Sequence, residues 1–252
     1  MDTVYTLRLS IDWKLISILS KIDRYDAEWT TIEKKERRSL KQLKSLATVR
    51  SVGASTRIEG SKMSDQEVDV LLKDLTIEKL TDRDSQEVAG YFDVLDTISE
   101  CFNDIPITEN SIKNLHNQLL RHSDKDAWHK GRYKQLSNSV EAILSNGSKQ
   151  IVFQTTPPGV ETEEAMRSLI DWYNSDDETH PLVKVSMFCY EFVSIHPFQD
   201  GNGRLSRLLS SILLLKQGYK WIEYVSFEHE SKIENQNTIE YLGAVNQKDQ
   251  MR

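Results

Sequence analysis

Hydrophobic positions recur at steps of three and four residues through most of the chain, which is the spacing of a helix that buries one face. The first such stripe follows Ser10 and predicts the first helix. Further along, Thr30 and Glu33 have the spacing of a capping box and predict the start of a second, highly charged helix. The positions expected to face inward on these two helices are Ile11, Leu15, Leu19, Ile22, Leu40, Leu43 and Leu46.

Three more helices are predicted before the middle of the chain. Ser64 and Glu67 form another capping-box pattern. A hydrophobic stripe runs from Val88 to Phe102, and Thr108 suits the N-cap of the helix that follows it. The expected buried positions of these helices are Val68, Leu71, Leu72, Val88, Phe92, Leu95, Ile112, Leu115 and Leu119.

The second half of the chain continues the helical pattern, with one exception. Pro181 suits the first turn of a helix, where its missing N–H would have no partner. Residues 139–154 instead alternate between hydrophobic and polar, around an Asn146-Gly147 turn, and predict a β-hairpin. The helices predicted around it cover residues 161–174, 181–195 and 203–216. The expected fold is therefore mainly α-helical, a compact bundle with one small hairpin.

The composition is that of an ordinary globular protein and excludes several classes of function. The 252 residues include 32 Lys and Arg against 39 Asp and Glu, a net charge of −7, which argues against nucleic acid as a partner. The chain has no uncharged apolar stretch of about 18 residues, so we expect no membrane span. It opens without the pattern of an export signal, so we expect a cytoplasmic protein. Two cysteines and scattered histidines predict no zinc site.

The segment from His196 to Arg207 concentrates the residues that suggest chemistry. Pro197 disfavours helical backbone at His196, so the preceding helix should end there. Gly201 and Gly203 can take positive φ and turn a loop so that its N–H groups converge. Such a loop at the N-terminus of a helix binds anions.

Charged side chains of the same segment complete a predicted phosphate site. Arg204 and Arg207 lie one turn apart on the following helix, and their guanidinium groups suit phosphate oxygens. Asp200 is a hard oxygen ligand, and one carboxylate with phosphate oxygens commonly holds Mg²⁺. The reference pKa of His196 suits proton removal near neutral pH. Each residue alone has an ordinary structural explanation, but their combination predicts a magnesium di- or triphosphate site with a base at its edge.

The same segment resembles the signature of the Fic family, His-Pro-Phe-x-Asp/Glu-Gly-Asn-Gly-Arg-x-x-Arg, at every specified position. A looser resemblance runs from Thr81 to Leu242. It implies a helical Fic core over residues 81–252, preceded by an N-terminal helical region over residues 1–80. It also implies transfer of AMP from ATP to a Tyr, Thr or Ser hydroxyl of a protein, the enzyme itself included, with release of pyrophosphate.

The resemblance implies a role for each residue of the segment. His196 would deprotonate the attacking hydroxyl, and Asp200 would hold Mg²⁺ against the phosphates. We assign Phe198 to the core, where an aromatic ring anchors the loop. The nucleotide-binding residues would be Gly201, Asn202 and Gly203 at the α- and β-phosphates, Arg204 and Arg207 at the β- and γ-phosphates, and Tyr241 at the adenine, where plain packing is the alternative.

Two further segments resemble regulatory and docking elements of the family. The hairpin over residues 139–154 matches the flap that would add the target protein's backbone as a strand, a plain structural hairpin being the alternative. The run from Ser55 to Gly60 resembles the family's inhibitory pattern, Ser/Thr-x-x-x-Glu-Gly/Asn. It implies that Glu59 pairs with Arg207, takes the place of the γ-phosphate and misplaces the phosphates of ATP.

Several alternatives stay open at this point. The same fold transfers UMP, phosphate or phosphocholine in other relatives, and Glu59 could instead position water for removal of AMP. A regulatory module that binds ATP without catalysis is the alternative from another class. A homo-oligomer is also compatible with the sequence.

Overall fold

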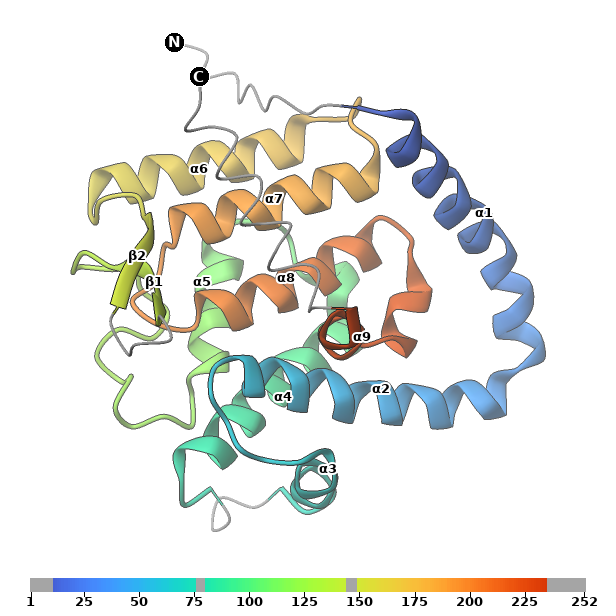
Figure 1. Cartoon of the computed structure of the whole chain (residues 1–252), viewed down its shortest axis with the longest axis horizontal. Coiled ribbons are helices and arrows are strands. Elements are labelled where there is room, and N and C mark those ends of the chain that lie inside the picture. The colour runs from blue at the N-terminus through green and yellow to red at the C-terminus, as the bar shows by residue number, and fades with distance from the viewer. Residues whose placement is uncertain (1–10, 76–79, 144–148, 235–252) are drawn as a thin grey trace.

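The computed structural model describes residues 11–75, 80–143 and 149–234. Figure 1 shows a mainly helical molecule with one hairpin at its edge. The elements in chain order are α1 (Trp13–Lys35), α2 (Arg37–Ile58), α3 (Asp65–Lys73), α4 (Arg83–Cys101), η2 (Phe102–Asp104), α5 (Glu109–Leu119), β1 (Ser139–Ile143), β2 (Lys149–Gln154), α6 (Val160–Ser175), α7 (Pro181–Ile195), α8 (Asn202–Lys216), η3 (Lys220–Tyr224) and α9 (Phe227–Glu234). The predicted fold class is confirmed.

Helix α8 lies at the centre of the fold and carries the largest share of the core. It is buried over most of its length because hydrophobic residues cover several of its faces. Helices α6 and α7 lie along one side of it, and α2 and α4 lie along the other (Figure 1). The loop between α7 and α8 therefore starts and ends on two helices that are fixed in the core.

The helices predicted from capping and periodicity agree closely with the structure. Ser64 and Glu67 make the reciprocal bonds of a capping box at α3, and the Thr108 side chain accepts the Ser111 N–H at α5. Helix α7 spans the predicted residues, while α6 and α8 each begin one residue earlier than predicted.

The predicted second capping box is wrong. Helix α1 runs straight through Thr30 and Glu33 to Lys35, and the break comes at Glu36. Thr30 and Glu33 can continue a helix as readily as begin one, and the burial of Trp29 against Tyr224 holds the helix there. Ser10 lies outside the described residues, and Asp12 is the N-cap of α1.

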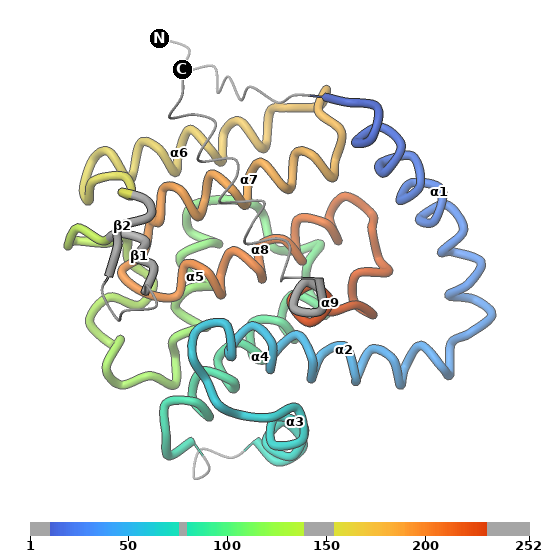
Figure 2. Tube along the Cα trace, viewed as in Figure 1, coloured from blue at the N-terminus to red at the C-terminus, as the bar shows by residue number. Residues whose placement is uncertain are grey.

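The inner faces of α1 and α2 differ from the prediction as well. On α1 only Trp29 is buried, and Ile11, just before the helix, is exposed. The reason is that α1 lies along the edge of the molecule (Figure 2). On α2 Leu40 is buried, but Leu43 and Leu46 are about half exposed. The buried stripe of α2 is set instead by its C-terminal half, which packs on α4.

The hairpin forms at the predicted place. Strands β1 and β2 pair antiparallel, from Ser139 opposite Gln154 to Ile143 opposite Lys149, with an irregularity between Val140 and Glu141. The predicted Asn146-Gly147 turn lies outside the described residues.

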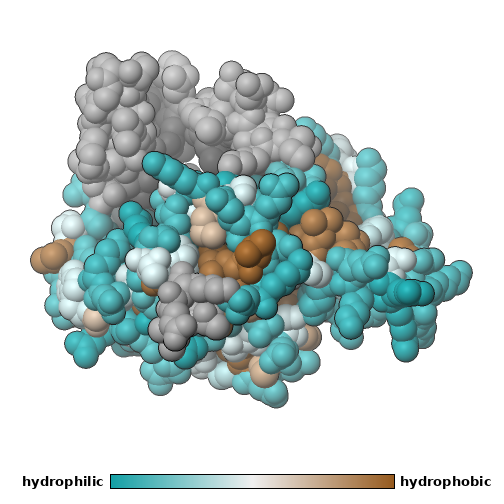
Figure 3. All heavy atoms as spheres, turned by 90° about the horizontal axis from the view of Figure 1, so that it is seen from below, coloured by the Kyte–Doolittle hydropathy of each residue, from teal (hydrophilic) through white to brown (hydrophobic). Residues whose placement is uncertain are grey.

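The described residues on the face shown in Figure 3 are mostly hydrophilic. On the face shown in Figure 3, hydrophobic residues gather in only a few places between charged and polar ones. Within the described part of the chain, no helix has both the length and the hydrophobicity that crossing a membrane requires.

Candidate active site

The loop between α7 and α8 begins with a sharp change of backbone direction. His196 follows the last residue of α7 in the left-handed conformation, with φ 53° and ψ 59°, and its N–H still donates to Phe192 O. Among the described residues it is the one non-glycine with positive φ. The prediction that the helix ends at His196 is confirmed, and the left-handed residue turns the imidazole away from the helix axis.

Internal hydrogen bonds hold the loop in shape. Asn202 Oδ1 accepts the Phe198 N–H at 2.8 Å, and Asn202 Nδ2 donates to Phe198 O at 2.7 Å. Asn202 is buried, so its side chain serves as a cross-link of the loop, while its backbone opens α8. Phe198 is fully buried, as predicted.

The two glycines of the loop act for different reasons. Gly201 has φ 80° and turns the chain into α8, as predicted. Gly203 lies inside α8 and does not have positive φ, so that part of the prediction is wrong. Gly203 instead lies close to Glu59: a Cβ at this position would lie 2.6 Å from Glu59 Oε1, so a side chain there would force the Glu59 carboxylate to move.

The geometry of His196 leaves one ring nitrogen available as a base. Its Nδ1 lies 3.3 Å from Val193 O, an acceptor, so Nδ1 carries the proton and Nε2 keeps its lone pair. Burial lowers the pKa of His196 below its ordinary value, and the nearby ammonium of Lys134 adds to this effect. At neutral pH the imidazole is therefore mostly in the neutral form that can accept a proton.

Asp200 is an accessible carboxylate that stays ionised. Burial alone would raise the pKa of Asp200, but Arg204, the Gly201 N–H and Lys125 outweigh it and keep the pKa below its ordinary value. The Asp200 side chain is 36% exposed. Within residues 11–75, 80–143 and 149–234, no three His, Cys, Asp or Glu side chains cluster as metal ligands. A single ionised carboxylate beside an anion loop fits Mg²⁺ that takes its other ligands from phosphates and water.

The two arginines of the segment contact different parts of the structure. Arg204 is 1% exposed and lies between two carboxylates, 3.4 Å from Asp200 Oδ1 and 3.5 Å from Glu87 Oε1. Its Nε and Nη1 are buried without a hydrogen-bond partner. Arg207 faces α2 and its side chain is 21% exposed. Of the two predicted phosphate clamps, Arg207 is the one that a ligand could reach directly in this structure.

Three hydrogen bonds join Arg207 to the end of α2. Arg207 Nε donates to Ser55 Oγ at 2.7 Å, and Nη2 donates to Ser55 O at 3.1 Å and to Glu59 Oε1 at 2.7 Å. The predicted contact between Glu59 and Arg207 is therefore present. Because Glu59 Oε1 also lies against Gly203, its carboxylate occupies the space beside the start of α8. Tyr241, the predicted adenine contact, lies outside the described residues.

Comparison with known proteins agrees with this geometry. Residues 106–214 match the family model described as the Fic/DOC family. Residues 106–214 thus resemble a Fic domain. A curated relative, the "Protein adenylyltransferase Fic" of Aedes aegypti, is 28% identical over 84% of this chain and 40% of its own length. The chain thus spans about two fifths of the length of the curated relatives it matches across most of its sequence.

Two solved structures share the fold. A Fic family protein from Desulfovibrio desulfuricans G20 superposes with a TM-score of 0.76 at 22% identity, covering 97% of this chain and 70% of its own. A Fic domain containing signaling protein from Bacteroides thetaiotaomicron gives a TM-score of 0.69 at 27% identity, covering 86% of this chain and 79% of its own. The match to the first structure takes in nearly the whole chain, so the shared fold includes the helices before the Fic domain.

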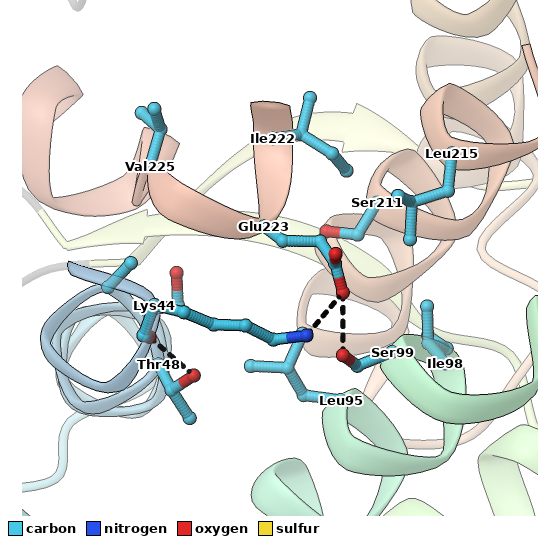
Figure 4. Close-up of a pocket in the computed structure, with 12 residues that line it drawn as sticks. Lys44, Thr48, Leu95, Ile98, Ser99, Ser211, Leu215, Ile222, Glu223 and Val225 are labelled. Atoms are coloured by element: carbon cyan, nitrogen blue, oxygen red, sulfur yellow. Dashed lines mark hydrogen bonds and ion pairs between the residues drawn. The ribbon is translucent and has the colours of Figure 1, made fainter. Parts of the chain in front are cut away.

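A polar contact anchors α2 to α4 and η3, away from the loop. Lys44 Nζ donates to Glu223 Oε1 at 2.8 Å, and Ser99 Oγ donates to the same oxygen at 2.6 Å (Figure 4). These three residues line a small cavity between α2, α4, α8 and η3, and none of its lining residues belongs to residues 196–207. The contact holds the helix that carries Ser55 and Glu59 against the core.

Two buried residues that support the loop were not predicted. His116 Nδ1 accepts the Gly131 N–H at 2.9 Å, so Nε2 carries the proton and donates to Asp200 O at 2.9 Å. Its ring stacks on Phe198 at 3.8 Å, and burial lowers the pKa of His116 to about 4. Lys134 is the second such residue, and its Nζ donates to Ile195 O at 3.1 Å. Neither belongs to the motif, and the periodicity of the sequence gave no signal for them.

Proposed function

We propose that this chain is a Mg²⁺-dependent protein adenylyltransferase that transfers AMP from ATP to a Tyr, Thr or Ser hydroxyl and is restrained by Glu59. The observation that supports this proposal most is the position of His196, whose Nε2 is free, next to the N-terminus of α8. At that N-terminus the N-cap Gly201 and the helical residue Gly203 have no side chains. The name of the curated relatives supports the same activity.

The reaction exchanges one bond at the α-phosphorus for another. His196 Nε2 takes the proton of the attacking hydroxyl as its oxygen bonds to the α-phosphorus. The bond from the α-phosphorus to its bridging oxygen breaks, and pyrophosphate leaves with that electron pair. Mg²⁺ held by Asp200 would neutralise phosphate charge. Arg204 and the Gly201 N–H keep Asp200 oriented, and the N–H groups at Asn202 and Gly203 stabilise the anion.

In this proposal Arg207 binds either a phosphate group or the end of α2, but not both at once. A phosphate group needs its guanidinium, which in the described state is bonded to Ser55 and Glu59. The proposal therefore assigns an inhibitory role to α2, within the N-terminal region 1–80, and assigns residues 81–252 to the catalytic core. Inhibition is relieved when Glu59 leaves Arg207.

The protein target is proposed to dock at the hairpin of residues 139–154. A two-stranded sheet leaves one edge of each strand without a partner strand among the described residues, and an extended peptide can pair with such an edge. Backbone pairing would present a side-chain hydroxyl without demanding one target sequence.

Labelled ATP tests the proposal. The Glu59→Gly protein is incubated with Mg²⁺ and ATP labelled at either the α- or the γ-phosphate, and label on the protein itself is measured. Label from the α-position only, lost in the Glu59→Gly/His196→Ala double variant, is the expected result. Label from the γ-position would mean phosphate transfer. No label from either position, with ATP bound, would favour a regulatory module and contradict the proposal.

A further inference from the structure

A buried lysine connects the catalytic loop to the base of the hairpin. Lys134 is 2% exposed, and its Nζ donates to three oxygens: Ile195 O at 3.1 Å, Asn138 Oδ1 at 2.8 Å and Thr155 Oγ1 at 2.9 Å. Its backbone N–H donates to Pro197 O at 2.8 Å. One residue thus bonds to both sides of His196 and to both flanks of the hairpin.

The carbonyls that Lys134 satisfies belong to the end of α7. The last carbonyls of a helix have no partner within the helix, and a buried end needs donors from elsewhere. Lys134 supplies Ile195 O and Pro197 O, and Asn138 Nδ2 supplies Phe198 O at 3.0 Å. The direction in which the backbone leaves α7, and with it the place of His196, depends on these donors.

The same group fixes the base of the hairpin. Asn138 precedes β1 and Thr155 follows β2. Thr155 Oγ1 donates to an oxygen of Asn138, either the backbone O at 2.8 Å or the side-chain Oδ1 at 2.6 Å. This bond closes the hairpin below its paired strands. Lys134 lies between this closure and the loop, so a shift of the hairpin base moves the oxygens that hold its ammonium.

The ammonium form is needed for the whole arrangement. Three acceptors require three N–H donors, and a neutral amine has only two. No carboxylate in the described part of the chain forms an ion pair with Nζ, and burial lowers the pKa of Lys134 to about 8. Lys134 in turn lowers the pKa of the neighbouring His196.

We propose that Lys134 is a positioning residue of the transfer reaction, which aligns the His196 backbone with the hairpin that receives the protein target. This inference rests on the proposed function. The hydrogen bonds that Lys134 makes within the described part of the chain go to Asn138, Thr155, Ile195 and Pro197 and to none of the residues at 200–207, so it acts on the alignment of base and acceptor and leaves ATP binding almost unchanged. Displacement of about 1 Å at a reacting group can lower a rate by ~10²-fold.

The test compares variants in the Glu59→Gly background, where the rate is not limited by inhibition. Self-modification by α-labelled ATP is measured against ATP concentration for Lys134→Met, Lys134→Arg and Thr155→Val. We expect Lys134→Met to lower the maximal rate by ~10-fold or more, with the KM for ATP changed by less than about three-fold. Lys134→Arg keeps a buried cation with several donors and should recover much of the rate.

The pH dependence of the transfer rate distinguishes a positioning role of Lys134 from a purely stabilising one. The Lys134 ammonium loses its proton as the pH passes about 8. The parent rate should therefore fall above this pH, and the fall should shift to higher pH in Lys134→Arg because guanidinium keeps its proton. Thr155→Val is the milder change and tests the hairpin side of the connection if Lys134→Met fails to fold.

Lys184→Met is the matched control. Lys184 is another buried lysine, on α7, bonded to Asp176 and lying over the Tyr173 ring, and its loss should lower the melting temperature without changing the rate below that temperature. Lys134→Met activity within about two-fold of the parent, or an equal loss in Lys184→Met, would overturn the inference. If the Glu59→Gly parent transfers no label, the proposed function itself has failed and the inference falls with it.

Discussion

Replacement of Glu59 by Gly tests the link between one surface contact and the proposed rate of AMP transfer. The contact to be removed is the 2.7 Å hydrogen bond from Arg207 Nη2 to Glu59 Oε1. A hydrogen bond to a charged group contributes about 1.5–3 kcal/mol. Because the side chains are 31% and 21% exposed, solvent screening reduces this to roughly 1–2 kcal/mol. Freeing Arg207 should therefore raise the rate by about 5–30-fold.

The loss of the carboxylate has a second effect in the same direction. Glu59 Oε1 lies so close to Gly203 that it fills the space beside the start of α8. The Gly variant empties this space and removes a negative charge that repels phosphate. The factor of about 5–30 is thus the lower end of the expected increase. The two hydrogen bonds that Arg207 donates to Ser55 remain in this variant. They keep the guanidinium partly engaged and so limit how far the rate can increase.

Initial rates of self-modification with α-labelled ATP provide the measurement. Glu59→Gln, which keeps the shape and one hydrogen bond but not the charge, should give an intermediate rate. Glu67→Gln is the control, because Glu67 lies on the exposed first turn of α3 and its carboxylate, among the residues that the structure describes, bonds to Ser64 alone. If Glu59→Gly binds ATP and transfers AMP no faster than the unaltered protein, the inhibitory role of the contact is refuted.

Three more predictions follow from contacts outside this pair. Lys44→Met removes the bond to Glu223 that anchors α2, and should raise AMP transfer by up to about five-fold in the unaltered chain but not in Glu59→Gly. Gly90→Ala would place a Cβ 2.0 Å from Leu119 O, and should lower the free energy of unfolding by about 1–3 kcal/mol in a thermal melt. Since burial lowers the pKa of His196 below its ordinary value of 6.5, the rate of Glu59→Gly should be more than half of its maximum at pH 6.5; a half-maximal rate above pH 6.5 would contradict this.

The parts of the fold that could be predicted are those set by local chemistry. Pro181 at the first turn and Pro197 after His196 bound α7 on both sides, and the structure has the helix over the predicted residues. Thr108 and Ser64 mark N-termini through bonds made within one turn. The same rules failed at Thr30 and Glu33, where a contact between Trp29 and Tyr224, far apart in the sequence, continues the helix.

The candidate site, like the fold, has features that the local sequence predicts and features that it does not. Twelve consecutive residues were enough to predict the end of α7 at His196 and the turn at Gly201, because these follow from residue type and short spacing. The direction of each arginine did not follow. Both lie on one helix, yet Arg204 turns to Glu87 and Asp200 while Arg207 turns to Ser55 and Glu59. The partner of each arginine depends on which other helices pack against α8. The spacing of residues within α8 does not show this.

Residues outside the motif supply hydrogen bonds that hold the loop in shape. The loop carbonyls at residues 195, 197, 198 and 200 accept hydrogen bonds from Lys134, Asn138 and His116, which come from the segment before the hairpin and from α5. Buried carbonyls without donors are costly, so loss of any of these donors would favour another loop conformation. A chain with the same motif but without these donors would keep the reactive groups and lose their alignment. The segment from α5 to Asn138 is therefore where relatives that share the motif should differ if they differ in transfer rate.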